Sequence, residues 1–157
     1  MNALVDRLAA LATERRLSMF LLGAAPGIAE RAAATLRGRH PDLRIAGTYA
    51  GSADDDADVL PRVVAAAPDV LLVAFGMPKQ ERWIARNLGH LPSARVAVGV
   101  GGSLDYLAGA AKPPPGLVHA IGLEWLWRLA RDPKRWRRQR VLPRFVVLVL
   151  LARMRRA

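Results

Sequence analysis

The stretch DVLLVAFGMPKQER, residues 69 to 82, contains the clearest fold signal in this chain. Its first part, Val70 to Phe75, is an apolar run without alternation, which favours a strand covered on both faces in a parallel sheet. Gly76 then allows a tight turn or a close ligand approach, and Pro78 suits the first turn of a following helix. Ligands of open α/β sheets bind where strands end. Lys79 to Glu81 is therefore either part of a ligand site or an ordinary turn with a solvated Lys/Glu pair.

Three other segments have the same form, an apolar strand that runs into a loop rich in Gly or Pro. We predict these strands at Met19 to Leu22, Leu43 to Tyr49 and Arg95 to Val100. Helical patterns precede and separate these strands. They lie at residues 3 to 16, at 28 to 36, from the acidic cluster at 54 to 58 through Val64, and at 81 to 88. Right-handed crossovers would place all four loops along one edge of a single sheet. We therefore predict an α/β fold, a Rossmann-like parallel sheet of about four strands flanked by helices, with a basic C-terminal helical tail.

Length and composition limit the class of protein. With 157 residues and 52% hydrophobic residues, the chain suits one domain with a real core and argues against disorder. The absence of cysteine excludes a disulfide framework, a thiolate metal site and a thiol nucleophile. The first residues carry charges at short intervals, unlike the apolar centre of a signal peptide.

The positive charge is concentrated at one end of the chain. Residues 1 to 130 hold 14 Lys and Arg against 12 Asp and Glu, whereas residues 131 to 157 hold 10 against 1. We therefore divide the chain into an α/β domain, 1 to 130, and a basic tail, 131 to 157. Such a tail predicts a polyanionic partner, which could be an anionic membrane surface, nucleic acid or substrate phosphates.

The tail also contains a short apolar run, Phe145 to Ala152, with arginines on both sides. As a helix this run is about 12 Å long, much less than the roughly 30 Å of a bilayer's hydrocarbon core. We predict that it attaches to the membrane surface without spanning it, and the alternative is that it packs against protein.

Two acidic features have competing interpretations. Asp54, Asp55, Asp56 and Asp58 precede a helical pattern, so we interpret them as capping that helix rather than as a metal site. Asp105 follows a Gly-Gly turn and is either a helix cap or an acceptor of hydrogen bonds from a ribose or a base. The small-residue turn from Gly23 to Gly27 is weak evidence for a phosphate cradle.

Taken together, four blocks resemble the WecG/TagA/CpsF glycosyltransferases. These blocks are Gly76-x-Pro78-Lys79-Gln80-Glu81, Gly99-Val100-Gly101-Gly102-Ser103-x-Asp105, Gly122-Leu123-Glu124-Trp125-x-x-Arg128-Leu129 and Pro133-x-Arg135-x-x-Arg138. The resemblance implies an inverting, metal-independent transfer of an N-acetylmannosamine-like or uronic sugar, without a cofactor. The implied donor is a UDP-sugar, the implied acceptor is linked to polyprenyl diphosphate, and the implied place is the cytoplasmic face of the membrane.

The resemblance also implies roles for particular residues. Gln80 and Asp105 would line the nucleotide pocket, while Arg128, Arg135 and Arg138 would stabilise the negative charge of the departing UDP, since arginine binds phosphate bidentately. The complete predicted substrate-binding set is Gly23, Gly76, Pro78, Gln80, Glu81, Gly101, Gly102, Asp105, Glu124, Arg128, Arg135 and Arg138.

Two departures from the family pattern shape our expectations. Pro113-Pro114-Pro115 stands where the family usually has Arg-Ala-Pro, and nothing here matches the N-terminal portion that carries the family's proposed general base, an aspartate. An acceptor hydroxyl needs a base within about 3 Å, so we expect the chain alone to be inactive in transfer, as a fragment, a late-start gene model or a degenerate paralogue.

Two other functions compete with sugar transfer. One is a nucleotide-sugar-binding protein without catalytic activity, and the other is a nucleic-acid-binding protein. We expect no nucleic acid partner, because the basic residues follow no helix-turn-helix or RNP-like pattern. The sequence is also compatible with a homo-oligomer.

Overall fold

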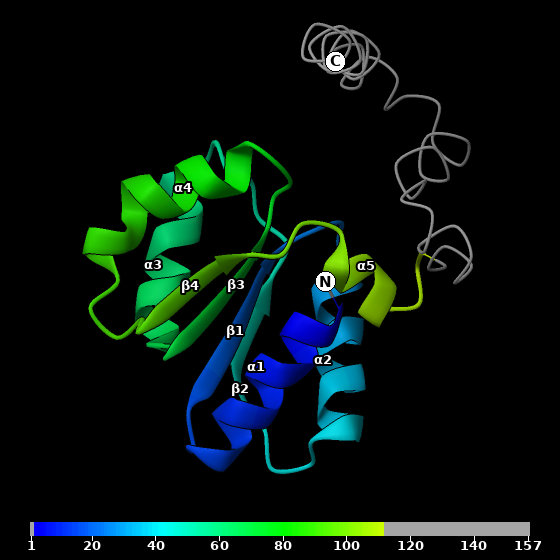
Figure 1. Ribbon diagram of the computed structural model, residues 1–157. Helices are drawn as coiled ribbons and strands as arrows, with labels where there is room; N and C mark the ends of the chain where they lie inside the picture. The colour runs from blue at the N-terminus through cyan, green and yellow to red at the C-terminus, as the bar shows by residue number, and fades with distance from the viewer. Residues whose placement is uncertain (1, 112–157) are drawn as a thin grey trace, which may run out of the picture. The chain divides into compact units, whose positions relative to one another are not determined.

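The structure is a computed structural model that describes residues 2–111, and the structural statements below concern this part of the chain. Its centre is a parallel sheet of four strands (Figure 1). The strands are β1 (Ser18–Gly23), β2 (Arg44–Tyr49), β3 (Val70–Ala74) and β4 (Val96–Gly99). They lie in the order β2-β1-β3-β4. The predicted α/β fold with a parallel sheet of about four strands is confirmed.

Helices cover both faces of this sheet (Figure 1). Helices α1 (Asn2–Glu14), α2 (Ile28–Arg39) and α5 (Ser103–Leu107) lie on one face, and α3 (Asp56–Ala66) and α4 (Lys79–Asn87) lie on the other. A short 3-10 turn, Leu88–His90, follows α4. In the described part of the chain no helix is both long and apolar enough to cross a bilayer.

The central strands are continuously apolar because each contributes to two cores. Met19 and Leu21 of β1 pack towards α1 and α2, whereas Phe20 and Leu22 pack towards α3 and α4. Strand β3 alternates in the same way, and all of its residues are buried. The period-two geometry of a strand sends neighbouring side chains to opposite faces, which explains why the run at Val70–Ala74 shows no polar alternation.

Element boundaries differ from the sequence-based predictions in a few places. β3 ends at Ala74, so the prediction that Phe75 continues the strand was wrong, and Phe75 lies in the following loop. α4 begins at Lys79, earlier than predicted. The short helix α5 was not predicted as an element. The helix is too short, and begins too close to Gly101 and Gly102, for its apolar residues to show a helical period in the sequence.

The beginnings of three strands are joined through Asp69, at the end of the sheet that we call the amino edge. One carboxylate oxygen of Asp69 accepts hydrogen bonds from the backbone N–H and the hydroxyl of Ser18, at 2.9 and 3.0 Å. The Asp69 carbonyl accepts from the N–H groups of Arg95 and Val96, at 2.8 and 3.2 Å. The bonds to the carboxylate, first that from the Ser18 N–H and then that from the Ser18 hydroxyl, hold the pKa of Asp69 below its ordinary value.

The strand order places a topological switch point between β1 and β3. The chain goes from β1 outward to β2 on one side, then returns to place β3 on the other side. At the opposite end from Asp69, which we call the carboxyl edge, the loops after the four strands lie together, as predicted. Loops that leave in opposite directions open a crevice at such a point, where ligands of open α/β sheets bind.

Candidate functional site

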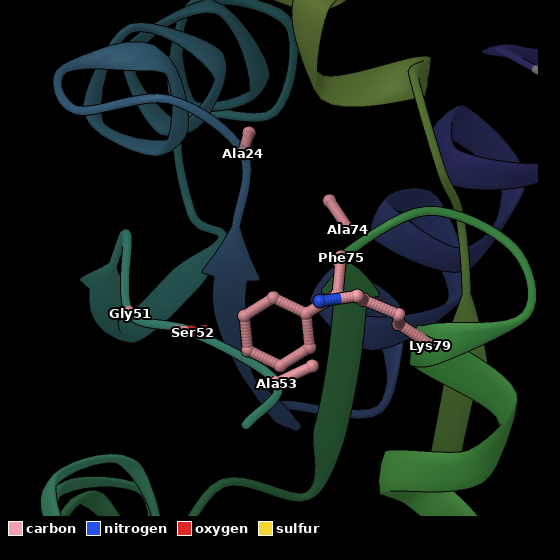
Figure 2. Close-up of a pocket in the computed structure, with 7 residues that line it drawn as sticks. All are labelled: Ala24, Gly51, Ser52, Ala53, Ala74, Phe75 and Lys79. Atoms are coloured by element: carbon pink, nitrogen blue, oxygen red, sulfur yellow. The ribbon is translucent and has the colours of Figure 1, made fainter. Parts of the chain in front are cut away.

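A cavity of about 240 Å³ lies at the carboxyl edge (Figure 2). Three loops, the end of β3 and the start of α4 contribute its lining. The lining residues are Ala24, Gly51, Ser52, Ala53, Ala74, Phe75 and Lys79. Ala24 follows β1 and Phe75 follows β3, so the cavity is at the switch point.

Gly23 makes the close packing at this point possible. A Cβ atom at position 23 would come within 2.9 Å of the Ala74 carbonyl carbon and of Phe75 Cδ1, and Gly23 has a φ of +96°. Both the space and the backbone angle therefore require glycine. Gly23 was predicted as a substrate-binding residue, and the structure gives it a packing role beneath the Phe75 ring.

Phe75 and Lys79 form the part of the lining nearest α4. The Phe75 ring also meets the buried Trp83 ring edge to face, with centroids 5.8 Å apart. In Figure 2 the Lys79 side chain extends from the start of α4 towards the Phe75 ring. Lys79 Nζ forms an ion pair with Asp54 Oδ2 at 2.5 Å, and both side chains are more than half exposed.

The loop between β2 and α3 is held in place by α4. Arg86 donates two hydrogen bonds to the Asp56 carboxylate, at 2.7 and 2.9 Å, and one to the Ala53 carbonyl at 3.0 Å. Asn87 donates a further bond to Asp56 at 3.2 Å. Because Arg86 stabilises the ionised form most strongly, the pKa of Asp56 lies below its ordinary value. This network positions Ser52 and Ala53 in the lining.

The other carboxylates of this loop serve the helix. Asp55 is the N-cap of α3, and its side chain accepts a hydrogen bond from the Asp58 N–H at 3.2 Å. Asp58 accepts hydrogen bonds from the Tyr49 hydroxyl and from Arg62, and these lower its pKa. The prediction of helix capping is confirmed for Asp55, with Asp56 and Asp58 in the first turn of α3, but it was wrong for Asp54, which pairs with Lys79 instead.

Gln80 joins two loops of the carboxyl edge. Its side chain is buried, its Oε1 accepts from the Gly101 N–H at 3.0 Å, and its Nε2 donates to Glu81 Oε1 at 2.8 Å. A Cβ atom at Gly99 would lie 2.5 Å from Gln80 Nε2, so glycine is needed there too. Gln80 thus ties the start of α4 to the turn after β4. It does not line the cavity, and its contact with a nucleotide stays a prediction.

The remaining predicted residues within 2–111 all lie at the carboxyl edge. Gly76 and Gly101 have φ values of +79° and +50°, which glycine adopts easily. Pro78 is the N-cap residue of α4 and is exposed, as is Glu81. Gly102 is the N-cap residue of α5. Their roles towards a ligand stay predictions.

Asp105 and Ser103 bring polar groups without partners to the turn after β4. Asp105 lies in the first turn of α5 and is partly exposed. Its carboxylate has no hydrogen-bond or ion-pair partner among the described residues. The Ser103 hydroxyl is buried and also lacks a partner there. A carboxylate in this position can accept hydrogen bonds from a ligand.

Part of the predicted site lies outside the described residues. This applies to Glu124, Arg128, Arg135 and Arg138, and to the tail from 131 to 157. Conversely, sequence reasoning did not select Ala24, Ser52, Ala53 or Phe75 as site residues. Lys79 was considered as a possible part of a ligand site and belongs to a recognised block, but it was not included in the predicted substrate-binding set. Its position beside Gln80 at a strand end was the available signal.

The four parallel strands and the cavity at their switch point define an open α/β domain with a cavity at its carboxyl edge, where open α/β sheets usually bind ligands. The family model described as "Glycosyl transferase WecG/TagA/CpsF family" matches residues 2–157. The chain belongs to this family.

Curated relatives agree with that membership. A protein of Bacillus subtilis (strain 168) is 33% identical over 140 residues, which cover 89% of this chain and 54% of the relative. One of Bacillus spizizenii is 35% identical over 139 residues, covering 88% and 54%. One of Staphylococcus aureus (strain MRSA252) is 33% identical over 150 residues, covering 96% and 59%. All three are named N-acetylglucosaminyldiphosphoundecaprenol N-acetyl-beta-D-mannosaminyltransferase. The chain thus spans little more than half the length of these relatives.

Proposed function

We propose that this chain forms the donor-binding domain of a glycosyltransferase. The donor is a UDP-sugar, N-acetylmannosamine-like or uronic, and the acceptor is a sugar linked to polyprenyl diphosphate. The observation that carries this proposal is the cavity at the switch point, in a chain that belongs to this transferase family. The relatives' names, which specify an N-acetylmannosaminyl group and a diphosphoundecaprenol acceptor, support the choice of sugar and lipid.

Asp105 recognises the nucleoside in this proposal. The carboxylate is partly exposed at the carboxyl edge and has no partner in the described part of the chain, so its acceptor capacity is available. Ribose hydroxyls and the uracil N–H are donors that match it. The Gln80 bond to Gly101 supports this role by fixing the turn that precedes Asp105.

The chemical step is an inverting displacement at the anomeric carbon. The acceptor hydroxyl loses its proton and forms the new C–O bond while the bond to UDP breaks, and UDP leaves with the electron pair. Arg128, Arg135 and Arg138 stabilise the charge that accumulates on the leaving diphosphate, without a metal ion. Transfer should therefore continue when divalent cations are removed by a chelator.

Calorimetry with UDP and a transfer assay together test the proposal. The full chain is titrated with UDP, then incubated with a labelled UDP-N-acetylmannosamine and an N-acetylglucosaminyl-diphosphate lipid, with and without EDTA. UDP binding with EDTA-resistant transfer supports the enzyme. Because nothing in this chain matches the portion that carries the family's proposed base, we expect UDP binding without transfer from residues 1 to 157 alone, and transfer once a relative's N-terminal portion is supplied. UDP binding without transfer even then favours the alternative, a nucleotide-sugar-binding protein. A chain that does not bind UDP contradicts both.

The basic tail brings the protein to its lipid-linked acceptor in this proposal, at the inner face of the membrane. Three or four arginines near an anionic surface contribute about 1 kcal/mol each, which suffices for reversible, salt-sensitive binding. Co-sedimentation compares the full chain with a version that ends at Leu142, on neutral and on anionic vesicles. Equal binding to both vesicle types, or by both versions, contradicts an electrostatic anchor.

A further inference from the structure

Among the described residues, Lys79 is the only charged side chain in the lining of the cavity. We propose that Lys79 binds a phosphate of the nucleoside diphosphate, and that Asp54 is the counter-ion that occupies Lys79 until the ligand arrives. This inference rests on the proposed function, which supplies the ligand, and it adds a specific contact within the described residues.

The position of Lys79 suits this role. Lys79 is the first residue of α4, so its ammonium group is carried on a rigid helix that starts at the carboxyl edge. Its side chain extends towards the Phe75 ring, with Ala53 also in the lining (Figure 2). The other lining residues are neutral. An anion that enters the cavity therefore meets one cation among neutral and mostly small lining residues, and a charge-assisted hydrogen bond is stronger than one between neutral groups.

The present partner of Lys79 is weakly held. Lys79 and Asp54 have side chains that are 52% and 71% exposed, and ion pairs with this exposure contribute little to stability. Apart from Lys79, the Asp54 carboxylate has no partner among the described residues. A phosphate, which carries more charge and more acceptor oxygens, can therefore replace Asp54 at small cost.

Neighbouring arginines are already committed to structural contacts. Arg86 holds both Asp56 and the Ala53 carbonyl, so a change of partner would release the loop. Arg62 pairs with Asp58 and lies over the Tyr49 ring, 4.6 Å from its centroid. Among these three cations around the β2–α3 loop, Lys79 alone has a single exposed partner.

The size of the cavity indicates which part of the ligand it receives. Its volume of about 240 Å³ is slightly below the roughly 300–1,000 Å³ that is usual for small-molecule sites. The cavity therefore accepts one portion of a nucleotide sugar, with the remainder outside. In this inference Lys79, at the start of α4, contacts the diphosphate, while Asp105, in the first turn of α5 and outside the cavity lining, contacts the nucleoside as in the proposed function.

Calorimetry on the full chain separates this contact from a general effect on the fold. UDP and uridine are titrated into the unaltered protein and into Lys79→Met and Lys79→Gln. We expect both variants to bind UDP at least about tenfold more weakly, the loss expected for a charged hydrogen bond, and to bind uridine unchanged. The control is Arg82→Met, which removes one positive charge from an exposed position of the same helix. It should change UDP affinity by less than about twofold.

Removing the counter-ion should have the opposite effect on UDP affinity to removing Lys79. Asp54→Asn removes the competitor for Lys79 and should tighten UDP binding by up to about fivefold, the range set by exposed ion pairs. In the Lys79→Met background the same change should have a much smaller effect, because no ammonium group is left to release.

The outcomes distinguish this inference from the proposed function. If the unaltered chain binds UDP and the Lys79 variants bind it equally well, Lys79 makes no phosphate contact and only the inference is wrong. Equal losses for UDP and uridine would also overturn it, since they indicate a disturbed cavity. If the unaltered chain does not bind UDP, the proposed function and this inference both fail.

Discussion

The amino and carboxyl edges of the sheet use polar groups in opposite ways. At the amino edge, the side chain and backbone of Asp69 hold the starts of β1 and β4, and the groups involved hydrogen-bond one another. At the carboxyl edge, the Asp105 carboxylate and the Ser103 hydroxyl lack partners in the described part of the chain. Lys79 has only an exposed one there. The polar groups of the first edge stabilise the fold, whereas Asp105 and Lys79 at the second edge are the residues to which we assign ligand contacts in the proposed function.

This difference shows how one sheet can separate stability from binding. Hydrogen bonds that are complete within the protein stabilise it, but have nothing left to offer a ligand. The carboxyl edge instead uses glycines with positive φ and small side chains, which allow close packing and leave a cavity. Substitutions of polar side chains at the two edges should therefore affect different measurements: the free energy of unfolding for Asp69, and ligand affinity for Asp105.

The largest effect is expected from Gly23→Ala at the carboxyl edge. The added Cβ would contact the Ala74 backbone and the Phe75 ring at 2.9 Å, and the φ of +96° disfavours alanine. Strain and overpacking together should lower the free energy of unfolding by about 3–4 kcal/mol, measured by urea denaturation. Gly27→Ala is the matched control, since its φ is +79° but the space around it is open. Equal losses for both variants would contradict the packing role of Gly23.

The next effect is on binding. Asp105→Ala should weaken UDP binding about tenfold to a hundredfold in calorimetry, because a hydrogen bond to a charged group contributes roughly 1.5–3 kcal/mol. The free energy of unfolding should change little, since the carboxylate has no partner among the described residues. Asp42→Ala, at an exposed turn before β2, is the control. An unchanged UDP affinity with the fold intact would remove Asp105 from the site.

Asp69→Asn should change stability and not UDP binding, the reverse of Asp105→Ala. It should lower the free energy of unfolding by about 1 kcal/mol, the usual range for a hydrogen bond, and leave UDP affinity unchanged. The lowered pKa means that the ionised Asp69 stabilises the fold above its unfolded pKa, near 3.9, and that this stabilisation is lost as the pH falls through the folded pKa. The difference between variant and unaltered protein should therefore shrink below about pH 4. A difference that does not depend on pH would contradict the assignment.

The smallest stability effect is expected from the same substitution at the other edge. Asp54→Asn breaks only an exposed ion pair and should change the free energy of unfolding by less than about 0.5 kcal/mol. Thermal and urea denaturation beside Asp69→Asn provide the comparison. A loss as large as that of Asp69→Asn would mean that the two edges do not differ in the way described.

The sequence alone determined the class of fold and much of the carboxyl edge. Apolar runs such as Val70 to Ala74 report burial on both faces, and the glycines and prolines after them report where strands end. Both signals are local, because they arise from side-chain alternation and from backbone angles. Asp55 as a helix cap was predictable for the same reason. Gln80 and Asp105 were selected through their blocks, but their roles towards a ligand stay predictions.

Tertiary structure decided the features that depend on strand order. Placing β3 beside β1 brings Phe75 over Gly23, and packing α4 near the β2–α3 loop brings Lys79 to Asp54. These pairs are far apart in the chain, so no local pattern connects them. The lining of the cavity is likewise drawn from loops that become neighbours only when the sheet forms. Periodicity can report which residues are buried, but only the folded sheet determines which loops meet, and therefore which cation faces the cavity.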